Sequence, residues 1–228
     1  IDSGIRMKGL FLKEGEEVEL VDPRTGETKF EHLEDEREFT TTQLERSVTA
    51  PDTNKKIIKE YAMYAREFEK EYGRFPKTLV FATNDLPNIS HADRLVNLIQ
   101  TEFSDKGRDF VKKITGRVDR PLGKIREFRN RPEEPAIAVT VDLLSTGVDI
   151  PTCEAIMFIR PVKSRILFEQ ILGRGTRLAK DIGKDHFTVY DAVGVVDYFK
   201  GATQFPEPST KKGTKSYKEI VDELNDNK

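Results

Sequence analysis

The sequence predicts an α/β fold, a parallel sheet with helices on both faces, and two observations lead to this prediction. Short apolar runs, among them "KTLVFAT" from Lys77 and "AIAVTV" from Ala136, alternate along the chain with segments of helical periodicity. These runs are continuously apolar, which is typical of parallel strands buried on both faces. With 228 residues, 36% of them hydrophobic, the chain is long enough for one such domain with a well-filled core.

The first seventy residues predict an extension to this domain. Residues 10–31 alternate apolar and polar side chains around the turn cluster Asp22-Pro23-Arg24-Thr25-Gly26, so we expect a β-hairpin there. Residues 34–49 are polar and show no regular pattern. From Pro51 to Gly73 apolar side chains recur at helical spacing, which predicts a long amphipathic helix.

Strands and helices are then expected to alternate. Ser90-His91-Ala92-Asp93 fits a capping box and predicts the start of a helix. Two more helices are expected, near residues 122–128 and over "SRILFEQILGRG". The remaining strands are expected at "FVKKIT", "EAIMFIR" and "HFTVYDAV". An apolar stripe in the polar tail, at residues 217–224, predicts one final short helix. We therefore expect three parts: an accessory hairpin and linker (1–50), the main α/β domain (51–205) and a polar tail (206–228).

The net charge and the cysteine content limit the partners and the cellular compartment that we expect for this chain. The net charge is −2, so any attraction for nucleic acid must come from local basic clusters. Cys153 is the single cysteine, and no apolar run approaches the roughly 20 residues needed to cross a bilayer. We expect no membrane partner and a reducing, cytoplasmic setting. Because the chain starts at Ile1 without an initiator Met, we also expect it to be a segment of a longer protein.

The segment "AVTVDLLSTGVDIP" follows a predicted central strand, and open α/β sheets bind their ligands beyond the carboxyl ends of strands. Gly147 allows close backbone approach, and the hydroxyls of Ser145 and Thr146 suit a phosphate. The carboxylates of Asp142 and Asp149 suit a ribose, a cation or an arginine. An ordinary capped loop explains this segment equally well.

The segment "FEQILGRGTRL" places Gln170, Arg174 and Arg177 at near-helical spacing, so we expect them on one face of a helix end. Arginine carries a fixed charge on a planar fork, which suits the charge of a transferred γ-phosphoryl group. The alternative is a pair of solvated arginines on a surface helix. Gly173 and Gly175 disfavour that alternative, because each glycine in a helix costs about 1 kcal/mol against alanine and suggests a packing or functional reason.

Basic side chains greatly outnumber acidic ones between residues 106 and 131. Such a cluster suits contact with a phosphate backbone, although a charged helix face is more commonly just solvated. The basic residues include Lys112, Lys113, Arg117, Arg120, Lys124, Arg126, Arg129 and Arg131.

Several kinds of site are not expected. Both Gly-Lys pairs, at 123–124 and 183–184, lack a following Ser or Thr, so no phosphate-cradling loop is present. No apolar strand ends in an Asp-Glu pair suited to magnesium, and the three histidines are isolated, so we expect no metal site. Asp22 and Glu27-Thr28-Lys29 match the spacing of a D…ExK nuclease pattern, but they straddle a tight turn and are interpreted as a charged hairpin tip.

Three motifs together resemble those of the second RecA-like motor domain of superfamily 2 translocases. "TVDLLSTGVDIP" is similar to helicase motif V, and "EQILGRGTR" is similar to motif VI, Q-x-x-G-R-x-x-R. "TLVFATNDLPNISHADRLV" resembles the motif IV strand and helix of the R (restriction) subunits of type I restriction enzymes. "ITGRVDRPLGKIREF" resembles the segment between motifs IV and V. The resemblance covers roughly residues 77–193.

The resemblance implies a RecA-like fold of the P-loop NTPase type and a role as the trailing half of an ATP-dependent double-stranded DNA translocase. ATP and Mg²⁺ would be bound mainly by a preceding RecA-like domain of the same chain. Arg174 and Arg177, with Gln170, would complete that site, and Arg177 is the better candidate for an arginine finger. Gly147 and Asp149 would lie near the nucleotide.

The resemblance also implies that Thr115, Gly116 and Thr146, with the neighbouring Arg117, face the nucleic-acid backbone. Val141 stands where many helicases carry a motif V threonine, so Thr140 or Ser145 is expected to contact phosphate instead. Double-stranded DNA and the modification and specificity subunits of a restriction complex would be the partners, and the segment alone is expected to be inactive. Two alternatives remain open: a repair or general superfamily 2 helicase domain, and a non-catalytic RecA-like nucleic-acid-binding module.

Overall fold

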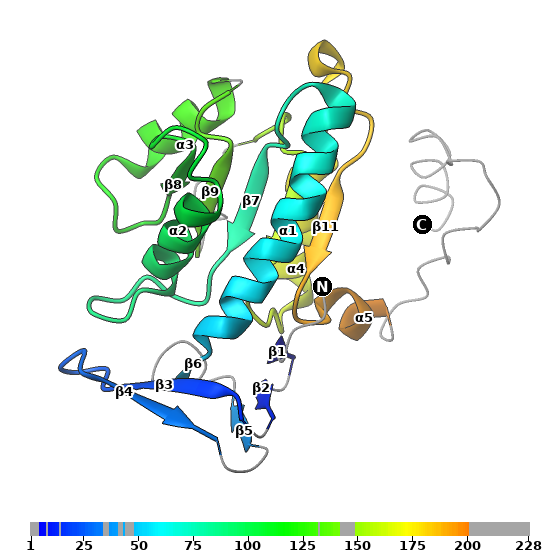
Figure 1. Ribbon diagram of the computed structural model, residues 1–228. Coiled ribbons are helices and arrows are strands. Elements are labelled where there is room, and N and C mark those ends of the chain that lie inside the picture. Colours follow the sequence, from blue (N-terminus) through cyan, green and yellow to red (C-terminus); the bar gives the residue numbers. More distant parts are fainter. Residues whose placement is uncertain are drawn as a thin grey trace. The chain divides into compact units, whose positions relative to one another are not determined.

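The computed structural model describes residues 5–7, 9–13, 15–33, 37–40, 43, 48–131, 133–141 and 149–200. It confirms the predicted parallel sheet, whose strands lie in the order β11-β10-β7-β9-β8 (Figure 1). Every neighbouring pair in this sheet is parallel. The strands are β7 (Thr78–Phe81), β8 (Val111–Lys113), β9 (Ile137–Thr140), β10 (Ala155–Phe158) and β11 (Thr188–Asp191). The three central strands are buried along their whole length, as their continuous apolar sequence predicts.

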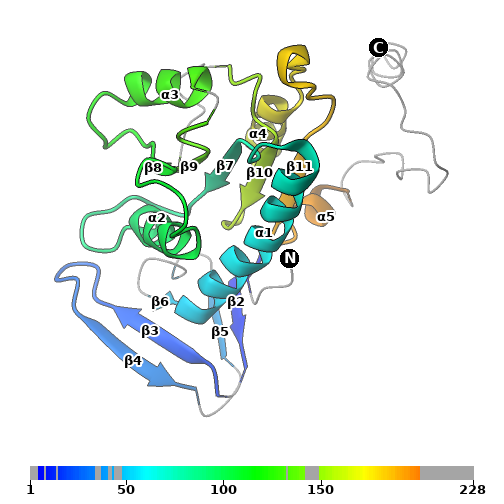
Figure 2. The same ribbon diagram turned by 45° about the horizontal axis from the view of Figure 1, so that its top comes forward.

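Helices cover both faces of this sheet. In Figures 1 and 2, α1 (Pro51–Tyr72) and α2 (His91–Glu102) lie in front of it and α4 (Arg165–Gly175) lies behind. The other helices are α3 (Pro121–Asn130), the 3₁₀ turn η2 (Lys180–Ile182) and α5 (Val195–Lys200). α5 contains the boundary between the chain's two compact units, Ile1–Val196 and Asp197–Lys228. The helix expected at residues 217–224 lies outside the described residues. No helix in the described ranges has the length and hydrophobicity of a membrane span.

Local signals account for the ends of the helices. α1 begins at Pro51, where proline is favoured, and ends at Gly73, whose φ of 68° is readily adopted only by glycine. The Gly73 N–H donates to the carbonyl of Glu69 at 2.9 Å. At the start of α2 the Ser90 hydroxyl accepts a hydrogen bond from the Asp93 N–H at 3.0 Å, which confirms the predicted cap.

The N-terminal hairpin is confirmed, but it belongs to a larger arrangement than expected. β3 (Glu17–Val21) pairs with β4 (Thr28–His32) around the predicted turn, and β6 (Val48–Thr49) extends this sheet to the order β4-β3-β6. A second antiparallel sheet contains β1 (Ile5–Arg6), β2 (Gly9–Leu12) and β5 (Arg37–Thr40). The prediction that residues 34–49 are irregular is therefore wrong. β5 and β6 are short, and Phe39 is the one buried side chain of β5. Neither strand therefore shows a repeated alternation of apolar and polar side chains.

Lys77, immediately before β7, ties the amino end of the sheet together. Its side chain is buried, and its ammonium donates to the main-chain carbonyls of Arg131 and Pro135. The ammonium also lies 5.0 Å from the centre of the Phe128 ring. Burial lowers the pKa of Lys77 to about 8, an effect that the Glu154 carboxylate opposes.

This pKa predicts a pH-dependent stability. Between about pH 8 and the ordinary lysine pKa of 10.5, the unfolded chain holds a proton that the folded chain has released, so folding gains stability as pH rises. The gain is at most about 1.4 kcal/mol per pH unit. Urea unfolding near pH 7.5 and 9.5 should show this rise in the natural chain relative to Lys77→Met. Equal free-energy differences between the two proteins at both pH values would refute it.

Candidate nucleotide and nucleic-acid sites

The structure places the predicted arginines at the end of α4 and just beyond it. Gln170 and Arg174 lie on the helix, whereas Arg177 lies two residues after its last residue, Gly175. The expectation that all three share one helix face is therefore wrong for Arg177. The chain leaves the helix at Thr176, whose hydroxyl donates to the carbonyl of Gly173 at 3.1 Å.

Arg177 lies beside Asp149, which unites two motifs that are distant in the sequence. The Nε atom of Arg177 is 3.5 Å from Oδ1 of Asp149, and the two side chains are 65% and 45% exposed. An ion pair so exposed contributes at most about 1 kcal/mol to stability. Its significance is positional, because it holds the Arg177 cation at the surface. Asp142, Ser145, Thr146 and Gly147 lie outside the described residues.

Asp149 does not remain at the edge of the sheet where it was expected. Thr140 ends β9, but Asp149 lies in the segment that returns to the start of β10 at Ala155. Its partner Arg177 follows the carboxyl end of α4, a helix that runs back from the end of β10. Asp149 and Arg177 therefore lie toward the amino ends of β10 and β11.

Lys184 is the residue that sequence reasoning missed here. It is 5% exposed, and its ammonium donates to the carbonyls of Pro151 at 2.9 Å and Gly175 at 2.8 Å, and to that of Arg177. Burial lowers the pKa of this amine, and the nearby side chains of Cys153, Glu154 and Asp149 oppose this shift. Because all three acceptors are main-chain carbonyls, no side-chain pattern in the sequence could have indicated the role of Lys184.

The two glycines of motif VI have different surroundings. A Cβ atom on Gly175 would lie 2.4 Å from the ring of Phe187, so the close approach of this ring requires a glycine or a shifted ring. A Cβ on Gly173 would meet nothing within 4 Å. The expected packing reason therefore holds for Gly175, and the structure offers none for Gly173.

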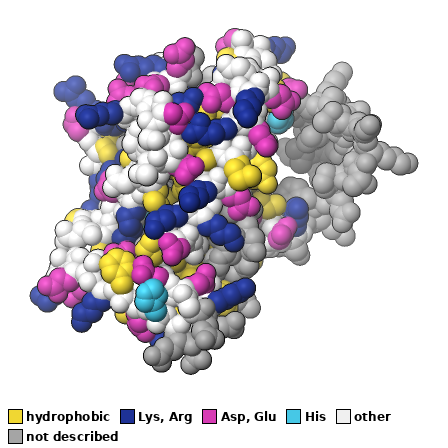
Figure 3. All heavy atoms as spheres, viewed as in Figure 1, with side chains coloured by type: hydrophobic (Ala, Val, Ile, Leu, Met, Phe, Trp, Pro, Cys, Tyr) yellow, Lys and Arg dark blue, Asp and Glu magenta, His cyan; other side chains and the backbone are white. Residues whose placement is uncertain are grey.

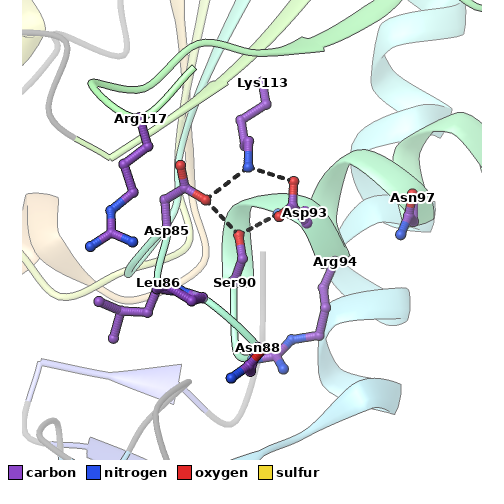
Figure 4. Close-up of a pocket in the computed structure, with 10 residues that line it drawn as sticks. Asp85, Leu86, Asn88, Ser90, Asp93, Arg94, Asn97, Lys113 and Arg117 are labelled. Carbon is purple, nitrogen blue, oxygen red and sulfur yellow. Dashed lines mark hydrogen bonds and ion pairs between the residues drawn. The ribbon is translucent and has the colours of Figure 1, made fainter. Parts of the chain in front are cut away.

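A second candidate site is a pocket of about 410 Å³ at the carboxyl ends of β7 and β8. Figure 4 shows Lys113 pointing between two carboxylates, with its Nζ 2.9 Å from Asp85 and 2.7 Å from Asp93. The Ser90 hydroxyl donates to Asp85 at 2.8 Å. Further side chains of the lining are those of Asn88, Arg94, Asn97 and Arg117. Donors from two strand ends and the start of α2 therefore meet in one hollow.

The Asp85 carboxylate accepts hydrogen bonds from three side chains around this pocket. Burial acts to raise the pKa of its carboxyl, but hydrogen bonds from Thr115, Lys113 and Ser90 together lower it. Asp85 therefore stays ionised and holds three donors in place.

The residues that were predicted to contact nucleic acid differ in their exposure. The Thr115 hydroxyl donates to Asp85 and accepts from the Arg117 N–H at 3.3 Å. Gly116 and Arg117 are exposed, and Arg117 lines the pocket. Thr140 is completely buried, because β9 lies inside a sheet covered on both faces, so its hydroxyl does not reach the surface. We therefore drop Thr140 as a phosphate contact.

The basic cluster is partly neutralised by neighbouring acids. Lys112 pairs with Asp109 and Arg131 with Glu127, as expected for a solvated charged face. Figure 3 shows Lys and Arg interspersed with Asp and Glu over the face in view. Lys113 and Arg117 differ from the rest of the cluster because they line a pocket.

The residues of the D…ExK pattern lie in and beside the turn between β3 and β4. The Asp22 carboxylate accepts hydrogen bonds from the backbone N–H groups of Arg24, at 2.7 Å, and Thr25, so it caps its own turn. Within the described ranges no three His, Cys, Asp or Glu side chains gather as metal ligands.

Known proteins resemble this chain in sequence and in fold. It is 36% identical over 195 residues to the endonuclease subunit of the type I restriction enzyme EcoKI of Escherichia coli K12, a match that covers 82% of this chain but only 16% of that subunit. A solved fragment described as an HsdR subunit of a type I restriction enzyme from Vibrio vulnificus YJ016 superposes with a TM-score of 0.55 at 32% identity, over 70% of this chain and 30% of that one. No family model matches the chain.

A more distant structure supports the fold alone. Domain 2 of the DEAD-box helicase Mss116p, bound to an RNA duplex, superposes with a TM-score of 0.52 at 16% identity, over 75% of this chain and 70% of that one. The fold and the sequence matches agree with the predicted motifs. The chain is a RecA-like domain of the helicase C-terminal type, similar over most of its length to a segment of the HsdR subunits of type I restriction enzymes.

Proposed function

We propose that this domain is the second motor half of an ATP-dependent double-stranded DNA translocase, within the R subunit of a type I restriction enzyme. The observation that carries the proposal is the exposed Arg177–Asp149 pair, which joins motif VI to motif V in a chain so similar to R subunits. In such an enzyme this subunit would act with modification and specificity subunits.

On the nucleotide side, Arg177 would act as the arginine finger. Its guanidinium is exposed and only loosely paired, so it can turn from Asp149 toward the γ-phosphate of ATP held by a preceding domain. Gln170 and Arg174 would contact the same nucleotide from α4. Because the sequence lacks a phosphate-cradling loop, its residues suit the completion of an ATP–Mg²⁺ site rather than the main binding of the ligand.

On the DNA side, the pocket around Asp85 would hold a backbone phosphate. Lys113 and Arg117 supply positive charge, and Asn88 and Asn97 supply amide donors, which are the groups that position a protein on a nucleic-acid backbone. A phosphate entering beside Lys113 would replace the more exposed of its two partners, Asp93. Gly116 would extend this surface. Ser145 and Thr146 of motif V, which lie outside the described residues, would be further phosphate contacts.

The test is the dependence of ATP hydrolysis on double-stranded DNA, measured with the full-length protein that contains this chain. Hydrolysis should be stimulated by DNA. Arg117→Ala should raise the half-saturating DNA concentration about fivefold or more and lower the slope of its salt dependence by about one. Arg129→Ala is the matched control, since Arg129 is an exposed arginine of α3 outside the pocket. Hydrolysis that does not depend on DNA would favour the non-catalytic module. Equal effects of the two variants would show that the pocket does not contact DNA.

A further inference from the structure

We propose that Lys184 is a positioning residue for Arg177, whose ammonium ties the end of motif V to the end of motif VI. This inference rests on the proposed function, because it concerns the placement of the proposed finger. Lys184 lies between η2 and β11, outside all the helicase motifs, and it is buried, so it acts without touching ATP.

Three main-chain carbonyl groups converge on one nitrogen, that of the Lys184 side chain. Pro151, Gly175 and Arg177 belong to two separate segments, yet the oxygen of each accepts a hydrogen bond from the Lys184 ammonium. Carbonyl dipoles that point at one place repel one another unless a cation lies between them. A lysine ammonium has three N–H donors, so Lys184 satisfies all three oxygens at once.

Two of these carbonyls lie in or beside the residues of the surface ion pair. Pro151 is two residues from Asp149, and Arg177 is itself a partner, so one ammonium fixes the backbone beside both members of the surface ion pair. The segment of Lys184 makes a further contact with α4, because the ring of Phe187 occupies the space beside Gly175. Two independent contacts therefore brace the end of α4, from which Arg177 extends.

Loss of the ammonium would leave the three oxygens facing one another in a buried place. The segments would move apart, and the guanidinium of Arg177 would move with its backbone. A displacement of about 1 Å in a catalytic group can lower the rate about 100-fold. The effect should fall on kcat rather than on the KM for ATP, because a finger acts on charge that develops in the transition state.

The experiment compares Lys184→Met, Arg177→Ala and the double variant in the full-length protein, with DNA at saturation. Lys184→Met should lower kcat by about 10- to 100-fold and change the KM for ATP by less than about threefold. The double variant should be no slower than Arg177→Ala, because both changes remove the same interaction. Lys77→Met is the matched control, because Lys77 is a second buried lysine that holds main-chain carbonyls, those of Arg131 and Pro135, but none of the three that Lys184 holds. Its folded protein should keep the natural kcat.

The outcomes separate this inference from the proposed function. An unchanged kcat in Arg177→Ala would reject the finger itself. A large loss in Arg177→Ala with none in Lys184→Met, or losses that multiply in the double variant, would reject only the positioning role. If circular dichroism shows that Lys184→Met does not fold, Lys184→Gln, which keeps two N–H donors, takes its place. A loss of about 10-fold is then expected, and a natural kcat would overturn the inference.

Discussion

Replacement of Arg177 by alanine is expected to lower DNA-stimulated ATP hydrolysis by the full-length protein at least about 100-fold. Arginine fingers in phosphoryl transfer contribute about 10³- to 10⁵-fold to kcat, and removal of one charge-stabilising donor costs about 10²- to 10³-fold in other enzymes. The KM for ATP should change little. The fold should be unaffected, since the Arg177 side chain is 65% exposed and its single described ion pair is weak.

Two further variants accompany this measurement, one as a control and one with an expected intermediate rate. Arg165→Ala removes an exposed arginine at the start of α4, paired with Glu169 at 2.8 Å and at the helix end opposite to Arg177, and should leave hydrolysis unchanged. Arg177→Lys keeps the charge without the planar fork and should lie between natural protein and alanine variant. Equal rates for Arg177→Ala and Arg165→Ala would show that Arg177 is one of the solvated arginines of the simpler interpretation.

The largest stability effect is expected at the pair formed by Arg74 and Glu154. The Glu154 side chain is 4% exposed, directly before β10, and accepts a hydrogen bond from the Arg74 guanidinium. Removal of one partner from a buried pair typically destabilises by about 3–5 kcal/mol, because the other charge stays buried. Arg74 is 30% exposed, so we expect about 3 kcal/mol for Arg74→Ala, measured by urea unfolding.

A second substitution separates the buried charge from the other contacts of Arg74. This guanidinium also lies 5.7 Å from the ring centre of Phe68 and 5.6 Å from that of Tyr72, and these contacts are lost in Arg74→Ala as well. Glu154→Gln removes the charge, so the double variant should recover part of the lost stability. Arg66→Ala breaks an exposed pair with Asp105 at 2.7 Å and should cost about 1 kcal/mol or less. Equal losses in Arg74→Ala and Arg66→Ala would contradict the account.

The elements of the parallel sheet could be predicted because their signals are local. β7, β9 and β10 are continuous apolar runs, and the Ser90 cap and Gly73 mark helix ends through contacts within a few residues. β5 and β6 escaped prediction because they are short and their partners, β2 and β3, are far away in the sequence. Long-range pairing leaves no period in so few residues.

The candidate site was predictable in part for the same reason. Arg174 and Arg177 could be singled out because motif VI has a recognisable spacing, but the pairing of Arg177 with Asp149 depends on how two loops meet. Lys184 could not be found, since it binds main-chain oxygens, which every residue carries. The burial of Thr140 follows from its place at the end of an inner strand rather than from its neighbours in sequence.

The most direct test of the central claim is movement along double-stranded DNA by the full-length protein, assembled with its partner subunits and supplied with ATP. Release of a triplex-forming strand would be timed at increasing distances from the loading site. For the natural protein we expect a lag that lengthens with distance, and for Arg177→Ala we expect no release. A lag that does not change with distance, or release by Arg177→Ala at the natural rate, would contradict it.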